Sequence, residues 1–198
     1  MTSPDTTPEI LDGREVLVGV SGGIASYKTA MLVSRLIQDG AGVTVVMTES
    51  ATRFVGAATF EALTGRGVVT GLFEDPRFPL GAHIQLSERA DLLVVAPATA
   101  NFLAKAAGGL ADDALSTLFL AFGGPTIFAP AMNAAMWDNA AVQRNVATLE
   151  EDGVTLVGPG RGWLSCRTEG TGRMAEAMEI HDAVHSQLAP VRPPQATS

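Results

Sequence analysis

The sequence predicts an α/β protein, a single-domain doubly wound parallel sheet of Rossmann-like type. Short apolar runs alternate with longer amphipathic stretches along the chain, which is the pattern of strands joined by helical crossovers. The apolar runs are almost continuous, as expected for parallel strands that are covered on both faces. Glycine or small polar residues follow several of these runs, and a length of 198 residues suits one domain.

Strands and helices are expected to alternate. The strand candidates are residues 15–20, 43–47, 68–69, 92–96, 126–129 and 154–157. The helix candidates are residues 24–38, a short helix from Ala51, 57–63, 98–107, 112–122, 141–152 and 175–188. Residues 71–82 and 158–172 are interpreted as loops, the second of them mobile. We assign residues 14–188 to the domain and residues 1–13 and 189–198 to disordered tails.

Composition narrows the classes of partner. The formal net charge is −8 and no basic run is present, which argues against binding of nucleic acid. The single cysteine, the absence of a signal-peptide pattern and the lack of a long apolar run predict a cytoplasmic protein without a membrane partner. Charged residues make up only 17%, against about 25% in typical domains, which suggests surface buried in an oligomer.

A glycine turn, Ser21-Gly22-Gly23, joins the first strand to the first helix. Backbone N–H groups at a helix N-terminus can bind phosphate without help from basic side chains. However, Gly19, Gly22 and Gly23 do not have the G-x-G-x-x-G spacing, and no P-loop lysine follows them. A phosphate cradle and a plain strand-to-helix turn therefore fit this segment equally well.

Polar residues also follow other predicted strands. The hydroxyl groups of Thr48 and Ser50 suit phosphate or ribityl contacts, although Ser50 could instead cap the helix that begins near Ala51. Thr99 opens a helix just beyond the fourth strand candidate, and Asn133 lies beyond the fifth. Because the carboxyl ends of parallel strands meet at one edge of a sheet, these residues and Gly22 are expected to lie together.

Asn133 stands within the most informative stretch, residues 129–137. Its amide offers two donors and one acceptor, which suits recognition of a carboxylate or an amide. Met132, Met136 and Trp137 could supply polarizable walls. For a lone asparagine the better interpretation would be a helix cap beside core residues.

Cysteine and histidine are the candidates for chemistry. Cys166 lies among glycine and arginine residues in a loop that we expect to be exposed, which favours a reactive thiol over a buried one. His83 could act as a base or a carboxylate partner, or hold its loop by a hydrogen bond. His181 and His185 have the i, i+4 spacing of metal ligands, but the sequence indicates no third ligand, so no metal site is assigned.

Residues 130–137, Pro-Ala-Met-Asn-x-x-Met-Trp, resemble the signature of the flavin-dependent cysteine decarboxylase (HFCD) family, especially its phosphopantothenoylcysteine decarboxylases. The resemblance extends over about residues 16–180. It includes the glycine turn, the Thr48-Glu49-Ser50-Ala51 loop, His83 before Ile84, residues 96–101, and Cys166 ahead of Gly170-x-Gly172-Arg173-Met174.

The resemblance implies a set of functional positions. FMN is the implied cofactor, and the family forms trimers, sometimes assembled further, with sites between subunits. His83 and Cys166 match catalytic residues, with Cys166 the acid on a flap, while Asn133 and Met136 match substrate-binding positions. The matching FMN-binding positions are Gly22, Gly23, Ile24, Ser50, Thr99, Ala100, Asn101, Phe102 and Ala131.

The implied reaction is decarboxylation of 4'-phosphopantothenoylcysteine to 4'-phosphopantetheine in coenzyme A biosynthesis. In the family's mechanism the sulfur-bearing carbon is oxidised by FMN before CO2 leaves, and the electrons return at the end. Alternatives are decarboxylation of a peptide's C-terminal cysteine and a flavin-binding regulatory subunit without turnover. Arg167 stands where bacterial members typically have glycine, which bears on substrate identity. We expect no ligase domain after Ser198.

Overall fold

The computed structural model describes residues 11–73, 76–79 and 81–188. Its centre is a five-stranded parallel sheet with the strand order β2-β1-β3-β4-β5. The strands are β1 (Glu15–Val20), β2 (Gly42–Met47), β3 (Leu92–Ala98), β4 (Thr126–Pro130) and β5 (Thr155–Leu156). The chain starts in the middle of the sheet and builds outward in both directions, so the expected doubly wound α/β fold is confirmed.

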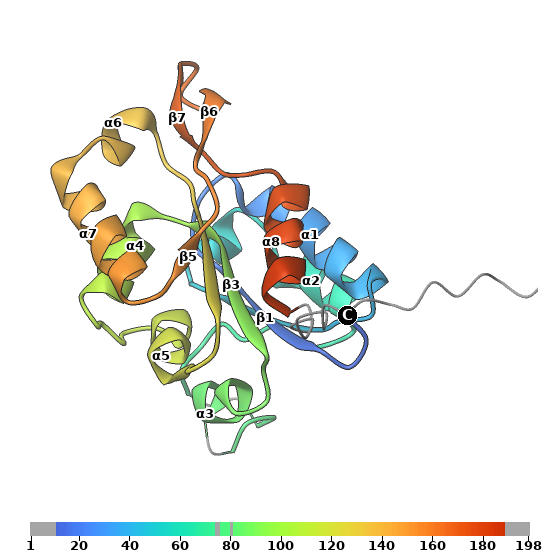
Figure 1. Ribbon diagram of the computed structural model, residues 1–198. Helices are drawn as coiled ribbons and strands as arrows, with labels where there is room; N and C mark the ends of the chain where they lie inside the picture. The colour runs from blue at the N-terminus through green and yellow to red at the C-terminus, as the bar shows by residue number, and fades with distance from the viewer. Residues whose placement is uncertain (1–10, 74–75, 80, 189–198) are drawn as a thin grey trace, which may run out of the picture.

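Helices cover both faces of the sheet, as Figure 1 shows. One face carries α1 (Ser26–Gln38), α2 (Ala57–Thr64) and α8 (Ala177–Leu188). The other carries α3 (Ala82–Ser87), α4 (Ala100–Ala107), α5 (Ala114–Ala121) and α7 (Ala140–Glu151). The short helices η1 (Ala51–Arg53) and α6 (Ala134–Trp137) follow β2 and β4 at the carboxyl edge.

Two hydrophobic clusters result from this layering, one on each side of the sheet. Strand β3 contributes to both, because its side chains alternate between the faces: Val94 packs with the α1 layer, whereas Leu93 and Val95 pack with the α5 layer. All seven residues of β3 are buried, which explains why the run is apolar throughout.

Capping residues mark where several helices begin or end. Thr99 accepts a hydrogen bond from the Phe102 N–H and begins α4. Asp113 and Ser116 form a reciprocal capping box at the start of α5. Gly65 closes α2 in the left-handed conformation, with φ of 67°.

Two segments differ from the sequence-based expectation. Residues 160–173 form an antiparallel hairpin of β6 (Gly160–Trp163) and β7 (Glu169–Arg173) instead of an irregular loop. The segment has several glycines and no alternation of apolar and polar residues, so it carried no strand signal. Strand β3 continues through Pro97 to Ala98, because the pairing register shifts between Val95 and Ala98 and needs no N–H from the proline.

Smaller differences concern short elements. Residues 68–69 make only an isolated bridge between Val69 and Val46, and helix α3 begins at the end of the expected loop. Leu11, placed in the expected N-terminal tail, is buried and donates its N–H to the Asp39 carbonyl oxygen. Residues 1–10 and 189–198 of the expected tails lie outside the described residues. No helix within the described ranges has both the length and the apolar character needed to cross a bilayer.

An aromatic trio under the sheet gives a test of the core. Phe128 of β4 is fully buried, and its ring centroid lies 5.3 Å from that of Phe102 and 5.2 Å from that of Phe119. We expect Phe128→Ala to lower the free energy of unfolding by about 3–5 kcal/mol in urea titrations. Phe73→Ala is the control, because that side chain is 83% exposed, and a change beyond about 0.5 kcal/mol is not expected there. Equal losses in the two variants would contradict this account of the core.

Candidate functional site

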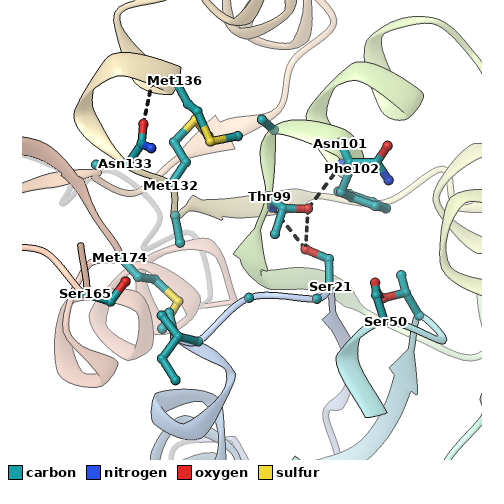
Figure 2. Close-up of a pocket in the computed structure, with 18 of the residues that line it drawn as sticks. Ser21, Ser50, Thr99, Asn101, Phe102, Met132, Asn133, Met136, Ser165 and Met174 are labelled. Atoms are coloured by element: carbon teal, nitrogen blue, oxygen red, sulfur yellow. Dashed lines mark hydrogen bonds between the residues drawn. The ribbon is translucent and has the colours of Figure 1, made fainter. Parts of the chain in front are cut away.

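A cavity of about 1140 Å³ opens at the carboxyl edge of the sheet, where β1 to β4 end. Its position is the one at which doubly wound sheets bind ligands. The sequence-predicted positions that line it are Gly22, Gly23, Ile24, Ser50, Thr99, Ala100, Asn101, Phe102, Ala131, Asn133 and Met136. Figure 2 shows several of these side chains converging on one space from separate loops.

The first wall of the cavity consists of backbone N–H groups. Residues 22–25 lead into α1, and within the described residues their N–H groups have no hydrogen-bond acceptor. They lie at the positive end of a 13-residue helix, where an anion is stabilised by both the donors and the helix dipole. Of the two interpretations of the glycine turn, this geometry favours the phosphate cradle.

The chain passes too close to itself at Gly22 for any side chain. A Cβ atom there would lie 2.3 Å from the Ser50 Oγ and 2.9 Å from the Ser50 backbone carbon. The β1–α1 turn and the β2–η1 loop are thus in direct contact. The Ser50 hydroxyl makes no cap bond to η1, and it lies 3.1 Å from the Thr48 Oγ1. Thr48 Oγ1 also accepts from the Ala51 N–H, so the bonded pair of hydroxyls keeps one free hydrogen for a ligand.

Ser21 connects two neighbouring loops beneath the cavity. Its buried Oγ donates to the Pro97 carbonyl oxygen over 2.7 Å and accepts from the Thr99 N–H over 3.0 Å. The Ser21 Oγ also lies 3.0 Å from the Thr99 Oγ1, as Figure 2 shows. This network sets the β1–α1 turn against the β3–α4 loop, and sequence reasoning treated Ser21 only as part of a turn.

Asn133 has the capping role considered for it and keeps a free donor. Its Oδ1 accepts from the Met136 N–H over 2.7 Å and caps α6. With the oxygen used in this way, the amide nitrogen is left as the free donor, and it has no partner among the described residues. Met132 and Met136 line the cavity beside it, but Trp137 packs against the hydrophobic cluster instead of forming a wall.

Several charged side chains around the cavity form ion pairs. Lys105 binds Asp112 over 2.6 Å and Asp113 over 2.8 Å. Burial would lower the pKa of Lys105, but these two hydrogen bonds raise it above its usual range. The hydrogen bond from Lys28 holds the pKa of Glu176 below its usual range. Lys28, Lys105 and both aspartates line the cavity but were not expected there, because only their helix positions were considered.

The hairpin β6–β7 borders the cavity with its inner residues and carries Cys166 at its tip. Gly172 approaches Met132 so closely that a Cβ atom would lie 2.3 Å from the Met132 carbonyl oxygen, and the Met132 N–H donates to the Gly172 carbonyl oxygen over 2.9 Å. The base of the hairpin is therefore held against the Asn133 loop. Ser165 lines the cavity, whereas Cys166 is exposed and does not, with its Sγ 3.1 Å from the Thr168 Oγ1.

Arg167 follows Cys166 with a φ of 64°, and no other non-glycine residue in the described ranges has a positive φ. This left-handed conformation normally favours glycine, because a side chain raises its conformational energy. Arg167, which departs from the family's pattern, has this conformation.

His83 lies away from this cavity. It is the second residue of α3, which Figure 1 shows at the opposite end of the sheet from α6 and the hairpin. The ring is half-buried and makes no hydrogen bond to a described residue, so the expected loop-holding bond is not observed. Within one chain the structure brings together the predicted cofactor and substrate positions but not His83.

Comparison with known proteins agrees with this geometry. Residues 5–189 match the family described as Flavoprotein. The chain is 47% identical over 171 residues to the coenzyme A biosynthesis bifunctional protein CoaBC of Bacillus subtilis, covering 86% of this chain and 42% of that protein. It thus spans less than half the length of the curated relatives it matches.

Two solved structures resemble the whole fold. The FMN-dependent cysteine decarboxylase SpaF is 37% identical with a TM-score of 0.77, and the match covers 89% of this chain and 95% of that one. A PPC decarboxylase mutant complexed with pantothenoylaminoethenethiol is 32% identical with a TM-score of 0.77, covering 87% and 97%. The resemblance drawn from the motifs is confirmed, and the chain belongs to the Flavoprotein family, alongside the flavin-dependent cysteine decarboxylases.

Proposed function

We propose that this protein is an FMN-dependent carbon–carbon lyase that decarboxylates 4'-phosphopantothenoylcysteine to 4'-phosphopantetheine, within the coenzyme A pathway. The observation that carries the proposal is the cavity itself, in which unpaired N–H groups of residues 22–25 lie across from the Asn133 amide. The 47% identity to CoaBC proteins supports this substrate over other cysteine derivatives. With one cysteine and relatives of this kind, we propose a cytoplasmic location.

The residues around the cavity fit FMN. The N–H groups of residues 22–25 suit its phosphate, because they supply donors and a favourable helix dipole without a lysine. The hydroxyls of Thr48 and Ser50 suit the phosphate or the ribityl chain, and residues 99–102 and Ala131 complete the surroundings. When bound, FMN supplies a reversible two-electron acceptor, which a cysteine carboxylate needs before CO2 can leave.

The remaining residues have roles toward the substrate. The Asn133 amide nitrogen would donate to the substrate carboxylate, since its oxygen is held by the α6 cap. The Met136 side chain would bound the pocket beside it. Cys166, carried on the hairpin tip, would protonate the product after CO2 loss, and this role requires the tip to close over the cavity.

A second copy of the chain would supply His83. This histidine lies at the other end of the sheet from the cavity, so one chain alone does not assemble the set of residues. The α1 helix and the turn before it present Ile24, Tyr27 and Met31 to solvent, with exposed fractions of 57%, 58% and 64%, at helical spacing. Ile24 and Tyr27 also line the cavity, so a neighbour packed on this face would reach it. A homotrimer with sites between subunits accounts for both observations.

Decarboxylation of a peptide's C-terminal cysteine is the second candidate. SpaF is named as a cysteine decarboxylase without mention of coenzyme A, and Arg167 beside Cys166 departs from the family's pattern, so this substrate is tested beside the first. The same cavity would serve both substrates, because the reacting group is a cysteine carboxylate in each.

Product analysis separates the candidates. We expect the purified protein, mixed anaerobically with 4'-phosphopantothenoylcysteine, to release CO2 and form 4'-phosphopantetheine, measured by mass spectrometry with the flavin spectrum followed in parallel. A peptide ending in cysteine is the matched second substrate. Turnover of the peptide alone would replace the first proposal by the second, and bound FMN without turnover of either would indicate a regulatory subunit.

The crowding at Gly22 predicts the behaviour of two glycine variants. Gly22→Ala forces the new methyl group against the Ser50 backbone and widens the cradle, so we expect at least a roughly tenfold loss of FMN affinity. Gly56→Ala is the control, because a Cβ atom there meets nothing within 4 Å and φ is −68°. Flavin fluorescence titration of the refolded apoproteins measures both. An unchanged affinity in Gly22→Ala would remove the cradle from the FMN site.

Sites shared between chains predict complementation. His83→Asn and Asn133→Ala should each abolish decarboxylation as separate proteins. If each site combines His83 of one copy with Asn133 of the next, random mixing during co-expression should restore about a quarter of the wild-type activity, because that share of sites receives both intact residues. No recovery in co-purified mixed oligomers would show that the sites do not combine these residues from two chains.

A further inference from the structure

Three side chains from two adjacent helices meet away from the cavity. Asp39 directly follows α1, and His181 and His185 lie on α8, packed beside it (Figure 1). The Asp39 Oδ2 lies 2.5 Å from the His181 Nε2 and 2.8 Å from the His185 Nε2, and the two nitrogens are 3.0 Å apart. The sequence shows the i, i+4 pair of histidines, and the fold adds a carboxylate as a third ligand from 142 positions away.

The three atoms have nearly the spacing of ligands around one metal ion. Bonds of about 2.0–2.1 Å from Zn²⁺ to nitrogen and oxygen place tetrahedral ligand atoms about 3.3 Å apart. All three separations here are shorter than that by less than an ångström, so small outward rotations of the side chains would admit the ion. Three protein ligands leave a fourth position for water.

Neighbouring groups orient the ligands. The Arg35 Nε lies 3.3 Å from the Asp39 Oδ1, so the other carboxylate oxygen is the one turned to the histidines. The His181 Nδ1 lies 3.4 Å from the Asp182 Oδ1, a contact of the kind that holds ligand imidazoles in metal sites. The backbone of Asp39 is held as well, by its N–H to the Arg35 carbonyl oxygen and its own carbonyl oxygen from the Leu11 N–H.

The three side chains are mostly buried. The side chains are 12%, 6% and 18% exposed for Asp39, His181 and His185, so the cluster is sheltered and opens to solvent beside His185.

We propose that Asp39, His181 and His185 bind one Zn²⁺ ion per chain, as a structural site that joins α1 to the last helix of the domain. Two imidazoles and a carboxylate suit zinc, whereas Mg²⁺ and Ca²⁺ prefer oxygen ligands alone. Helix α1 leads away from the cavity for about 20 Å before it reaches Asp39, so the ion would not take part in the decarboxylation. The proposal is therefore independent of the proposed function.

Metal binding is measured on the full chain after treatment with a chelator and desalting. Titration with ZnCl2 by calorimetry should give one site per chain in the wild type. His185→Gln should weaken binding by more than the roughly 10–100-fold that loss of an outer partner costs. His83→Gln is the matched control, because it removes the histidine outside the cluster, and it should bind zinc like the wild type.

Stability and spectroscopy provide independent readouts. Zinc at about 100 times its dissociation constant should raise the Tm by roughly 5–10 °C in the wild type and by far less in His185→Gln. Co²⁺ should give the intense visible bands of a tetrahedral site, again dependent on His185. Asp39→Asn, which keeps the side-chain shape, serves if His185→Gln folds poorly by circular dichroism. Absence of zinc binding in the wild type, or equal binding in the cluster variants, would overturn the proposal.

Discussion

The hydrogen bonds of Ser21 are the interaction on which the rest of the site depends. They tie the end of β1 to the Pro97 carbonyl oxygen and to the Thr99 N–H, and so align two adjacent strand ends. Helices α1 and α4 both start from this junction, one with unpaired N–H groups and the other capped by Thr99. Loss of this buried hydroxyl would leave the part-buried Thr99 N–H without its acceptor, which costs up to about 1–3 kcal/mol when no water replaces it.

The positions of residues that depend only on their sequence neighbours could be predicted from the sequence. Asn133 follows an apolar run and a proline, and Gly22 lies between a strand and a helix, so the sequence alone predicts a place for each at the carboxyl edge. The hairpin was missed because glycines at positions such as Gly162 and Gly170 remove the alternation that marks a strand. Lys105 was missed because its importance comes from Asp112 and Asp113, which lie just before the next helix, α5.

Sequence patterns could not predict which residues far apart in the chain become neighbours in the fold. The resemblance matches His83 to a catalytic position without placing it in the fold, and α3 carries it to the far end of the sheet from the cavity. His181 and His185 looked like an incomplete pair, because the residue that meets them comes from the end of the first helix. In both cases the position of a histidine relative to distant segments follows from the topology of the sheet, which no local sequence rule supplies.

The construction of the hairpin separates its base from its tip. The base is fixed by the close approach of Gly172 to Met132, whereas the tip closes on itself through the Leu164 N–H to the Thr168 carbonyl oxygen and the Arg167 N–H to the Leu164 carbonyl oxygen. The turn at the tip is therefore held by its own backbone hydrogen bonds. Because Ser165 lines the cavity and Cys166 follows it, Arg167 is the position of this turn where charge and size can change without altering the cavity wall, so substrate preference can vary there above an unchanged cofactor site.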